Sequence, residues 1–203
     1  MQGSTFGECR ERSKAGVGKI FVTRITFHMP VISWTFDPNH CNIRFVARHL
    51  FISEVEGTFG SFNGAVTSDN DELENANVFF EIDVSSIKTS SDIRDNNLRS
   101  ENFFDVTNYP KISFRTVSFQ RTLGQLYTLR GELTIKNVTK VIDLEVQLNG
   151  CIIDPDGKEK AGLKVRGSLN RFDYNVNFNR IVNSIIDVGS DISFVCNIEL
   201  FKK

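Results

Sequence analysis

The fold is decided by residues 127–148, which spell YTLRGELTIKNVTKVIDLEVQL. In both halves of this stretch, apolar side chains alternate with polar ones. The apolar positions are Tyr127, Leu129, Leu133 and Ile135, and then Ile142, Leu144, Val146 and Leu148. A period of two is typical of strands that bury one face and expose the other. Lys136-Asn137-Val138 separates the halves, and Asn tolerates the left-handed backbone of a tight turn, so the stretch predicts an antiparallel hairpin.

The same alternation runs through most of the chain from Trp34 onward. It is clear in residues 77–84 and 191–200, and weaker in residues 43–49, 59–66, 112–119 and 163–169. Turn-forming residues separate these segments, as in Asp154-Pro155-Asp156-Gly157. About eight strands with one apolar and one polar face, joined by short connections, predict an all-β fold, either a sandwich or a closed antiparallel barrel.

Residues 89–104 break the alternation and predict a short helix. Thr89 and its neighbours are good N-cap residues, and Asp92 follows Thr89 at the spacing of a capping box. We expect this helix to cover one end of the barrel. The residues expected to face inward from this segment are Ile93, Leu98, Phe103 and Phe104.

Arg94 and Asp95 lie within this predicted helix, and three roles are open to them. They can belong to a solvated helix face, or they can pair and tie the helix to the barrel rim as structural residues. Arg94 can instead meet the polar head group of a ligand, because a guanidinium is a planar and always charged donor.

The composition describes a globular protein that is rich in phenylalanine. Of the 203 residues, 40% are apolar and 24% are charged, with a net charge of -1, which argues against disorder. No basic run is present, so nucleic acid is not expected as a partner, because phosphate binding depends on clustered Lys and Arg. The 18 Phe against 3 Tyr and 1 Trp suit a cavity lined with hydrocarbon, although they would also suit a dense core.

Candidate catalytic and metal-binding groups are few. The histidines are His28, His40 and His49, and no Cys/His spacing typical of a zinc site accompanies them. We therefore expect no metal and no other cofactor. His49 falls on the apolar side of its predicted strand, where it is either a half-buried, hydrogen-bonded side chain or a ligand contact. The four cysteines are scattered and are expected to be free thiols.

Several blocks of residues occur in an order that is typical of one protein family. The blocks are Trp34-Thr-Phe-Asp-Pro-Asn-His40, Gly57-Thr-Phe59, Arg94-Asp95-Asn-Asn-Leu98-Arg99-Ser100-Glu-Asn-Phe103-Phe104-Asp105, Tyr109-Pro110, Gly131-Glu-Leu133-Thr134-Ile135 and Asn170-Arg171-Phe-Asp173. Over about residues 33–201 the sequence thereby resembles the YceI-like family.

The resemblance implies an eight-stranded, lipocalin-like antiparallel barrel with a short capping helix, formed by residues 31–203. Members of that family hold polyisoprenoid, quinone-type or fatty-acyl chains inside the barrel and are not generally enzymes, so a lipid or isoprenoid ligand is implied here. Eight strands enclose an interior just wide enough for one slender ligand. The residues expected to contact it are Phe45, His49, Phe80, Ile82, Arg94, Phe103, Phe114, Tyr127, Leu129 and Phe194.

Two other functions compete with lipid binding. An enzyme acting on a hydrophobic substrate in the same cavity would need a titratable group inside it, for which His49 and Asp95 are the candidates. A structural or interaction barrel would instead be packed solid with side chains. A homodimer is compatible with each of these functions.

Residues 1–30 are expected to form an extension outside the barrel. Their alternation is weak, they carry no secretory signal pattern, and the family resemblance begins just after Met29-Pro30. No segment reaches the roughly 20 apolar residues of a membrane helix. We therefore expect no stable membrane insertion and a cytoplasmic location, although many relatives are periplasmic.

Removal of residues 1–28 tests whether this extension is separate from the barrel. If Met29 is a natural start, or if the preceding segment is only loosely attached, the deletion should shift the melting temperature by only a few degrees. Thermal unfolding followed by circular dichroism measures the shift. Loss of folding would instead make the segment an integral strand.

Overall fold

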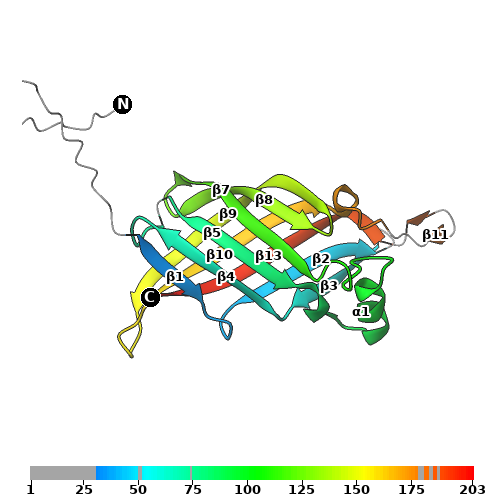
Figure 1. Ribbon diagram of the computed structural model, residues 1–203, viewed down its shortest axis with the longest axis horizontal. Helices are drawn as coiled ribbons and strands as arrows, with labels where there is room; N and C mark the ends of the chain where they lie inside the picture. Colours follow the sequence, from blue (N-terminus) through cyan, green and yellow to red (C-terminus); the bar gives the residue numbers. More distant parts are fainter. Residues whose placement is uncertain (1–30, 50–51, 74, 178–180, 183–184, 187) are drawn as a thin grey trace, which may run out of the picture.

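A single sheet that closes on itself organises the chain. The computed structural model describes residues 31–203 except 50–51, 74, 178–180, 183–184 and 187. The predicted extension of residues 1–30 lies outside the described residues, so the effect of deleting residues 1–28 stays a prediction. Strand β1 (Ile32–Phe36) pairs with β4 on one side and with β13 on the other. The ring β1-β4-β5-β7-β8-β9-β10-β13 is therefore a closed barrel of eight antiparallel strands, as expected (Figure 1).

The remaining elements follow in chain order. They are β2 (Asn42–His49), β3 (Ser53–Phe59), β4 (Phe62–Ser68), β5 (Asn77–Asp83), the 3-10 turn η1 (Val84–Ser86), β6 (Ile87–Thr89), α1 (Asp92–Arg99), β7 (Lys111–Leu123), β8 (Leu126–Ile135), β9 (Val138–Ile153), β10 (Glu159–Asn170), the 3-10 turn η2 (Arg171–Tyr174), β11 (Ile181–Val182), β12 (Ile185–Ile186) and β13 (Val188–Lys202).

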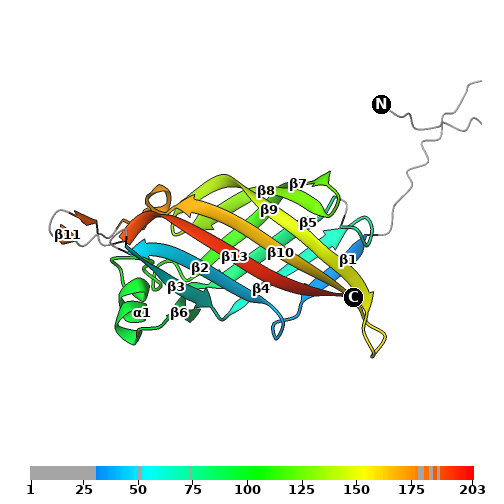
Figure 2. The same ribbon diagram turned by 180° about the vertical axis from the view of Figure 1, so that it is seen from behind.

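Strands β2, β3 and β6 lengthen the barrel wall at the α1 end. The long strand β13 pairs with β10 along one edge, and along its other edge with β2 and then with β1. Seen from behind, β13 runs between β10 and β2 (Figure 2). Residues 59–66, predicted as one strand, are divided between β3 and β4, because the chain leaves the pairing at Gly60 and Ser61.

Helix α1 covers the end of the barrel opposite to the C-terminus (Figure 1). Its N-cap is Ser91, whose hydroxyl accepts a hydrogen bond from the Arg94 amide. The prediction that Ile93 faces inward is wrong, because this side chain is 81% exposed. Among the described residues, no helix is long and apolar enough to cross a membrane.

Asp95 is the residue that fastens α1 to the wall. Its carboxylate is fully buried and accepts hydrogen bonds from the Thr89 amide at 2.8 Å and the Thr89 hydroxyl at 2.6 Å. The Lys88 ammonium lies 3.3 Å from the other carboxylate oxygen. Burial raises the pKa of this carboxyl, but the hydrogen bonds from Thr89 and Lys88 outweigh burial, so the pKa lies below its ordinary value.

The predicted pairing of Arg94 with Asp95 is therefore wrong. Neighbouring helix residues point in directions about 100° apart, so their side chains do not face each other. The arginine that ties α1 to the barrel is Arg99. Its guanidinium donates to the backbone carbonyls of Ser85 at 2.8 Å and Ile87 at 2.6 Å.

Replacement of Asp95 tests this anchor. Asp95→Ala should lower the free energy of unfolding by about 1–3 kcal/mol at neutral pH, because the Thr89 donors lose a buried acceptor. Because the pKa of Asp95 is lower in the folded protein than in the unfolded chain, the Asp95 carboxylate stabilises the fold fully above its unfolded pKa of about 4. This stabilisation is lost as the pH falls through the folded pKa. Urea unfolding measures this: the difference in the free energy of unfolding between wild type and Asp95→Ala should be smaller in acid than at pH 7.

Arg94→Ala is the matched control in the same helix. It should change the free energy of unfolding by less than about 0.5 kcal/mol. A cost equal to that of Asp95→Ala would contradict the assignment of Thr89 and Lys88 as the partners of Asp95.

Candidate ligand-binding cavity

The barrel encloses an apolar cavity of about 250 Å³. Side chains from seven of the eight barrel strands, all but β4, line it, together with side chains from β2 and β3 and with Leu98 of α1. Along β13 the lining includes Val188 and then every second residue from Ile192 to Ile198, which alone span roughly 20 Å at the rise of a strand. A second void of about 60 Å³ adjoins it and shares five lining residues with it, namely Phe36, Val78, Leu129, Val165 and Ile198. The interior is therefore a narrow apolar tunnel and not a filled core.

Seven of the ten predicted contact residues lie around this cavity. They are Phe45, Phe80, Ile82, Phe103, Phe114, Leu129 and Phe194. Arg94 is not among the lining residues. The side chain of His49 lies outside the described residues, although its backbone ends β2.

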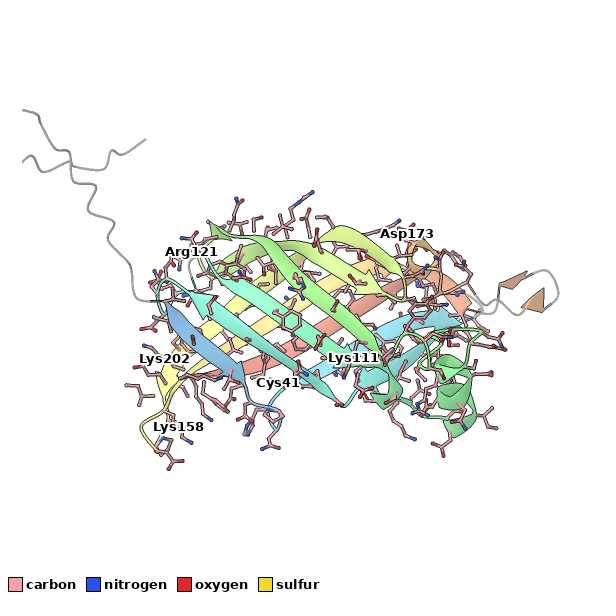
Figure 3. All side chains as sticks on the ribbon, viewed as in Figure 1. Cys41, Lys111, Arg121, Lys158, Asp173 and Lys202 are labelled. Atoms are coloured by element: carbon pink, nitrogen blue, oxygen red, sulfur yellow. The ribbon has the colours of Figure 1, made fainter. Side chains whose placement is uncertain are left out.

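Tyr127 is in a different place from the one predicted. It faces inward but is not among the lining residues of either void, and its ring stacks on Phe119 with centroids 4.9 Å apart. Its hydroxyl donates to the Glu72 carbonyl at 3.0 Å and accepts from the Arg121 guanidinium. Arg121 marks the end of the barrel away from Asp173 and α1 (Figure 3). Tyr127 thus belongs to the packed end of the barrel.

The loop between β4 and β5 completes the packing of that end. Leu73 is 2% exposed and lines the smaller void together with Ala76. At the opposite end, Phe103 and Phe104 follow α1 and contact the main cavity. The Phe104 ring meets the ring of Phe59 edge-on, with centroids 6.4 Å apart. The tunnel is thus packed shut at one end and covered by the α1 segment at the other.

Four phenylalanine rings line the tunnel by lying over glycines of a neighbouring strand. The pairs are Phe45 with Gly57, Phe80 with Gly64, Phe114 with Gly131 and Phe194 with Gly167, and at Gly64 the Phe36 ring approaches as well, at 2.8 Å against 3.0 Å for Phe80. A Cβ atom on Gly57 would lie only 2.2 Å from Phe45 Cζ, so the ring occupies the space that a side chain would take. Each ring therefore occupies space next to the wall that a side chain at the glycine would need.

Few polar side chains reach this cavity. Burial raises the pKa of Cys196 to about 12, so its thiol is protonated at neutral pH. Arg171 and Tyr174, both of η2, also belong to the lining and are 4% and 1% exposed. Neither was predicted as a site residue. The only sequence signal was the block Asn170-Arg171-Phe-Asp173, because a four-residue turn has no period that would mark an inward face.

A separate cluster of ionisable groups lies away from the cavity. His40 Nδ1 is 2.8 Å from Asp37 Oδ2 and 3.9 Å from Glu199 Oε1, and the three ligand atoms lie within 4.8 Å of one another. Such atoms could hold a cation. The Lys160 ammonium, however, already contacts Glu199 Oε1 at 2.8 Å, so the cluster has an internal counter-charge.

A closed antiparallel barrel with an apolar cavity inside is a lipocalin-like barrel. Within that class, the chain belongs to the YceI-like family, whose domain model matches residues 34–200. A UPF0312 protein of Staphylococcus aureus strain bovine RF122 / ET3-1 is 34% identical over 169 residues, which are 82% of this chain and 96% of that protein.

Solved structures show the same fold. BcnA of Burkholderia cenocepacia has a TM-score of 0.71 at 17% identity, over 81% of this chain and 98% of its own. A polyisoprenoid binding domain from Saccharophagus degradans has a TM-score of 0.68 at 14% identity, over 85% and 99%. The Campylobacter jejuni YCEI protein has a TM-score of 0.64 at 28% identity, over 77% and 90%.

Substitution of the glycines tests whether they keep the tunnel open. The three atoms nearest to a methyl group on Gly57 all belong to the Phe45 ring, so Gly57→Ala should fold while pushing that ring into the cavity. We expect affinity for a lipophilic fluorescent probe to fall several-fold. On Gly64 the methyl group meets the Phe79 backbone carbonyl at 2.5 Å, so Gly64→Ala should instead destabilise the fold by about 1–3 kcal/mol.

Gly60→Ala is the control for both variants. The nearest atom to its new methyl group is the Ser86 carbonyl at 4.0 Å, so probe affinity and the melting temperature should both stay close to wild type. Unchanged probe binding by Gly57→Ala would contradict the role given to the Phe45 ring.

Proposed function

We propose that the barrel binds one long apolar molecule in its lumen, a polyisoprenoid, quinone-type or fatty-acyl chain, and sequesters or transports it. The observation that carries this proposal is the open apolar tunnel of about 250 Å³. Ligand pockets commonly have volumes of about 300–1,000 Å³, so this tunnel suits a slender chain and not a broad polycyclic molecule. The polyisoprenoid binding domain of Saccharophagus degradans, which shares the fold, supports the ligand class.

The energetic cost of an empty tunnel favours a ligand over a purely structural barrel. Cavities left by core substitutions cost about 24 cal/mol per Å³, which for a void of this size is on the order of 6 kcal/mol. Typical domains have a net stability of about 5–15 kcal/mol. An unoccupied tunnel would thus cost much of the stability of the fold, whereas an apolar ligand restores the missing contacts at about 0.8 kcal/mol per CH₂.

The chemistry of the lining supports binding over catalysis. Asp95, one of the two candidates for an acid or base, is held by Thr89 and Lys88 and is not a lining residue. The Cys196 thiol is protonated at neutral pH, as its pKa of about 12 requires. These groups are poorly suited to proton transfer or nucleophilic attack inside the tunnel.

Analysis of bound lipid tests the proposal. Protein purified from cells should carry an isoprenoid or fatty-acyl species that native mass spectrometry and an organic extract reveal. Binding should survive high salt, because the attraction is apolar and not ionic. Apo protein alone, together with a melting temperature that added long-chain lipids leave unmoved, would exclude lipid binding and favour a structural barrel.

A charge placed in the tunnel should remove the ligand. Phe80→Asp and Phe194→Asp put a carboxylate among apolar side chains, which is costly, so both should abolish co-purification while leaving folded protein. Phe79→Asp is the matched control, because Phe79 precedes Phe80 in β5 and its ring lies beneath the Arg115 guanidinium, 4.8 Å from it. This variant should keep the lipid. Equal lipid loss from all three variants would show that the effect is not specific to the tunnel.

A further inference from the structure

Three side chains of the kind that bind metal ions meet away from the tunnel. Asp37 and His40 lie in the connection between β1 and β2, and Glu199 lies in β13. His40 Nδ1 is 2.8 Å from Asp37 Oδ2 and 3.9 Å from Glu199 Oε1, and the three atoms all lie within 4.8 Å of one another. At bond lengths of about 2.0–2.2 Å, the ligand atoms around a tetrahedral zinc ion lie roughly 3.4 Å apart. Small side-chain rotations would therefore bring all three atoms onto one ion.

The exposure of these side chains suits a site that takes an ion from solvent. The side chain of Asp37 is only 10% exposed and that of Glu199 is 29% exposed, whereas that of His40 is 60% exposed. The Asn39 amide donates to Asp37 Oδ1 at 3.0 Å and holds this carboxylate in position. The cluster thus combines a fixed carboxylate with an imidazole that can turn toward an incoming ion.

The charges around the cluster favour a divalent cation. The hydrogen bond from His40 holds the pKa of Asp37 below its ordinary value, so this carboxyl is ionised at neutral pH. The Lys160 ammonium lies 2.8 Å from Glu199 Oε1 and 3.6 Å from Asp154 Oδ2. Within this group, three carboxylates face one ammonium, which leaves two negative charges when the imidazole is neutral. A divalent ion offsets both of them.

The cluster lies where the last strand changes partners. Along one edge, β13 pairs with β2 as far as Asn197 and with β1 from Leu200 onward. Glu199 falls in the gap between these two pairings. Its carbonyl accepts a hydrogen bond from the Asp37 amide at 2.8 Å, and its amide donates to the Cys41 sulfur at 3.2 Å. An ion bound here would join β13 to the β1–β2 connection at the seam where the barrel closes.

We infer that Asp37, His40 and Glu199 bind a Zn²⁺ ion through two carboxylate oxygens and one imidazole nitrogen, and that the ion clamps the seam of the barrel. The imidazole favours Zn²⁺ over Mg²⁺ and Ca²⁺, which prefer oxygen ligands. Water would supply the fourth ligand. The sequence predicted no metal site, because Glu199 is far from the other two residues along the chain and no motif links them.

Calorimetric titration of the untagged protein with zinc chloride tests the site. Wild-type protein should bind one zinc ion, and saturating zinc should raise the melting temperature by a few degrees, because an ion that binds the folded barrel stabilises it. Magnesium chloride should leave the melting temperature unchanged. His40→Ala removes an exposed side chain, so this variant should fold normally. It should bind zinc at least about tenfold more weakly, because even groups that only orient a metal ligand are worth that much.

Lys160→Met should have the opposite effect on zinc affinity. The ammonium competes with the ion for Glu199 Oε1, so its removal should tighten zinc binding several-fold. Arg166→Met is the matched control, because it also removes one positive charge, but from an exposed ion pair with Glu145. This variant should bind zinc as wild type does. Equal tightening by both variants would show a general effect of net charge and overturn the assignment of Glu199 as a ligand.

Cys151→Ser controls for zinc that binds a thiol, because Cys151 is exposed. This variant should bind zinc as tightly as wild type. The inference is overturned if wild-type protein binds no zinc, if His40→Ala binds it with unchanged affinity, or if Cys151→Ser loses it. None of these outcomes affects the proposed function, because Asp37, His40 and Glu199 are not among the residues that line the tunnel.

Discussion

The barrel depends on four phenylalanine rings that lie over glycines. Eight strands in a closed ring enclose a space that large side chains can fill. Here Phe45 and Phe194 turn their rings onto Gly57 and Gly167, directly opposite them in the strand register. Each ring supplies the wall with the apolar surface that its glycine neighbour lacks. The result is a well-packed wall around an interior that is wide enough for one slender ligand.

The polar interactions complement this arrangement by staying at the ends. Asp95 and Arg99 fix α1 to the wall at one end, and Tyr127 with Arg121 and Glu72 ties together the packed end. Between them, the tunnel wall is almost entirely hydrocarbon. Rigid ends and an apolar middle allow the contents of the tunnel to change without disturbing the hydrogen bonds that hold the fold.

The strands could be predicted because alternation is a local property of a pleated chain. Alternation identified the inward faces of residues 77–84 and 127–135, but it does not give the position of each residue along the barrel axis. Tyr127 was therefore predicted to contact the ligand, whereas it lies in the packed end of the barrel. The short helix was confirmed as α1, but the prediction that both of its apolar residues face inward was wrong for a geometric reason. Ile93 and Leu98 are five residues apart and point about 140° away from each other, so both could not face inward. Tyr174 lies in a short turn whose burial depends on contacts distant in sequence.

The role of β13 has a consequence for how the chain folds. This last strand contacts β10, β2 and β1, and it alone joins the first strand to the tenth. Until residues 188–202 leave the ribosome, the edges of β10, β2 and β1 that pair with β13 stay unpaired, and such edges are templates for pairing with other chains. Contacts this distant in sequence form slowly. A chaperone that shields open sheet edges during synthesis would therefore matter more to this protein than to a helical one of equal size.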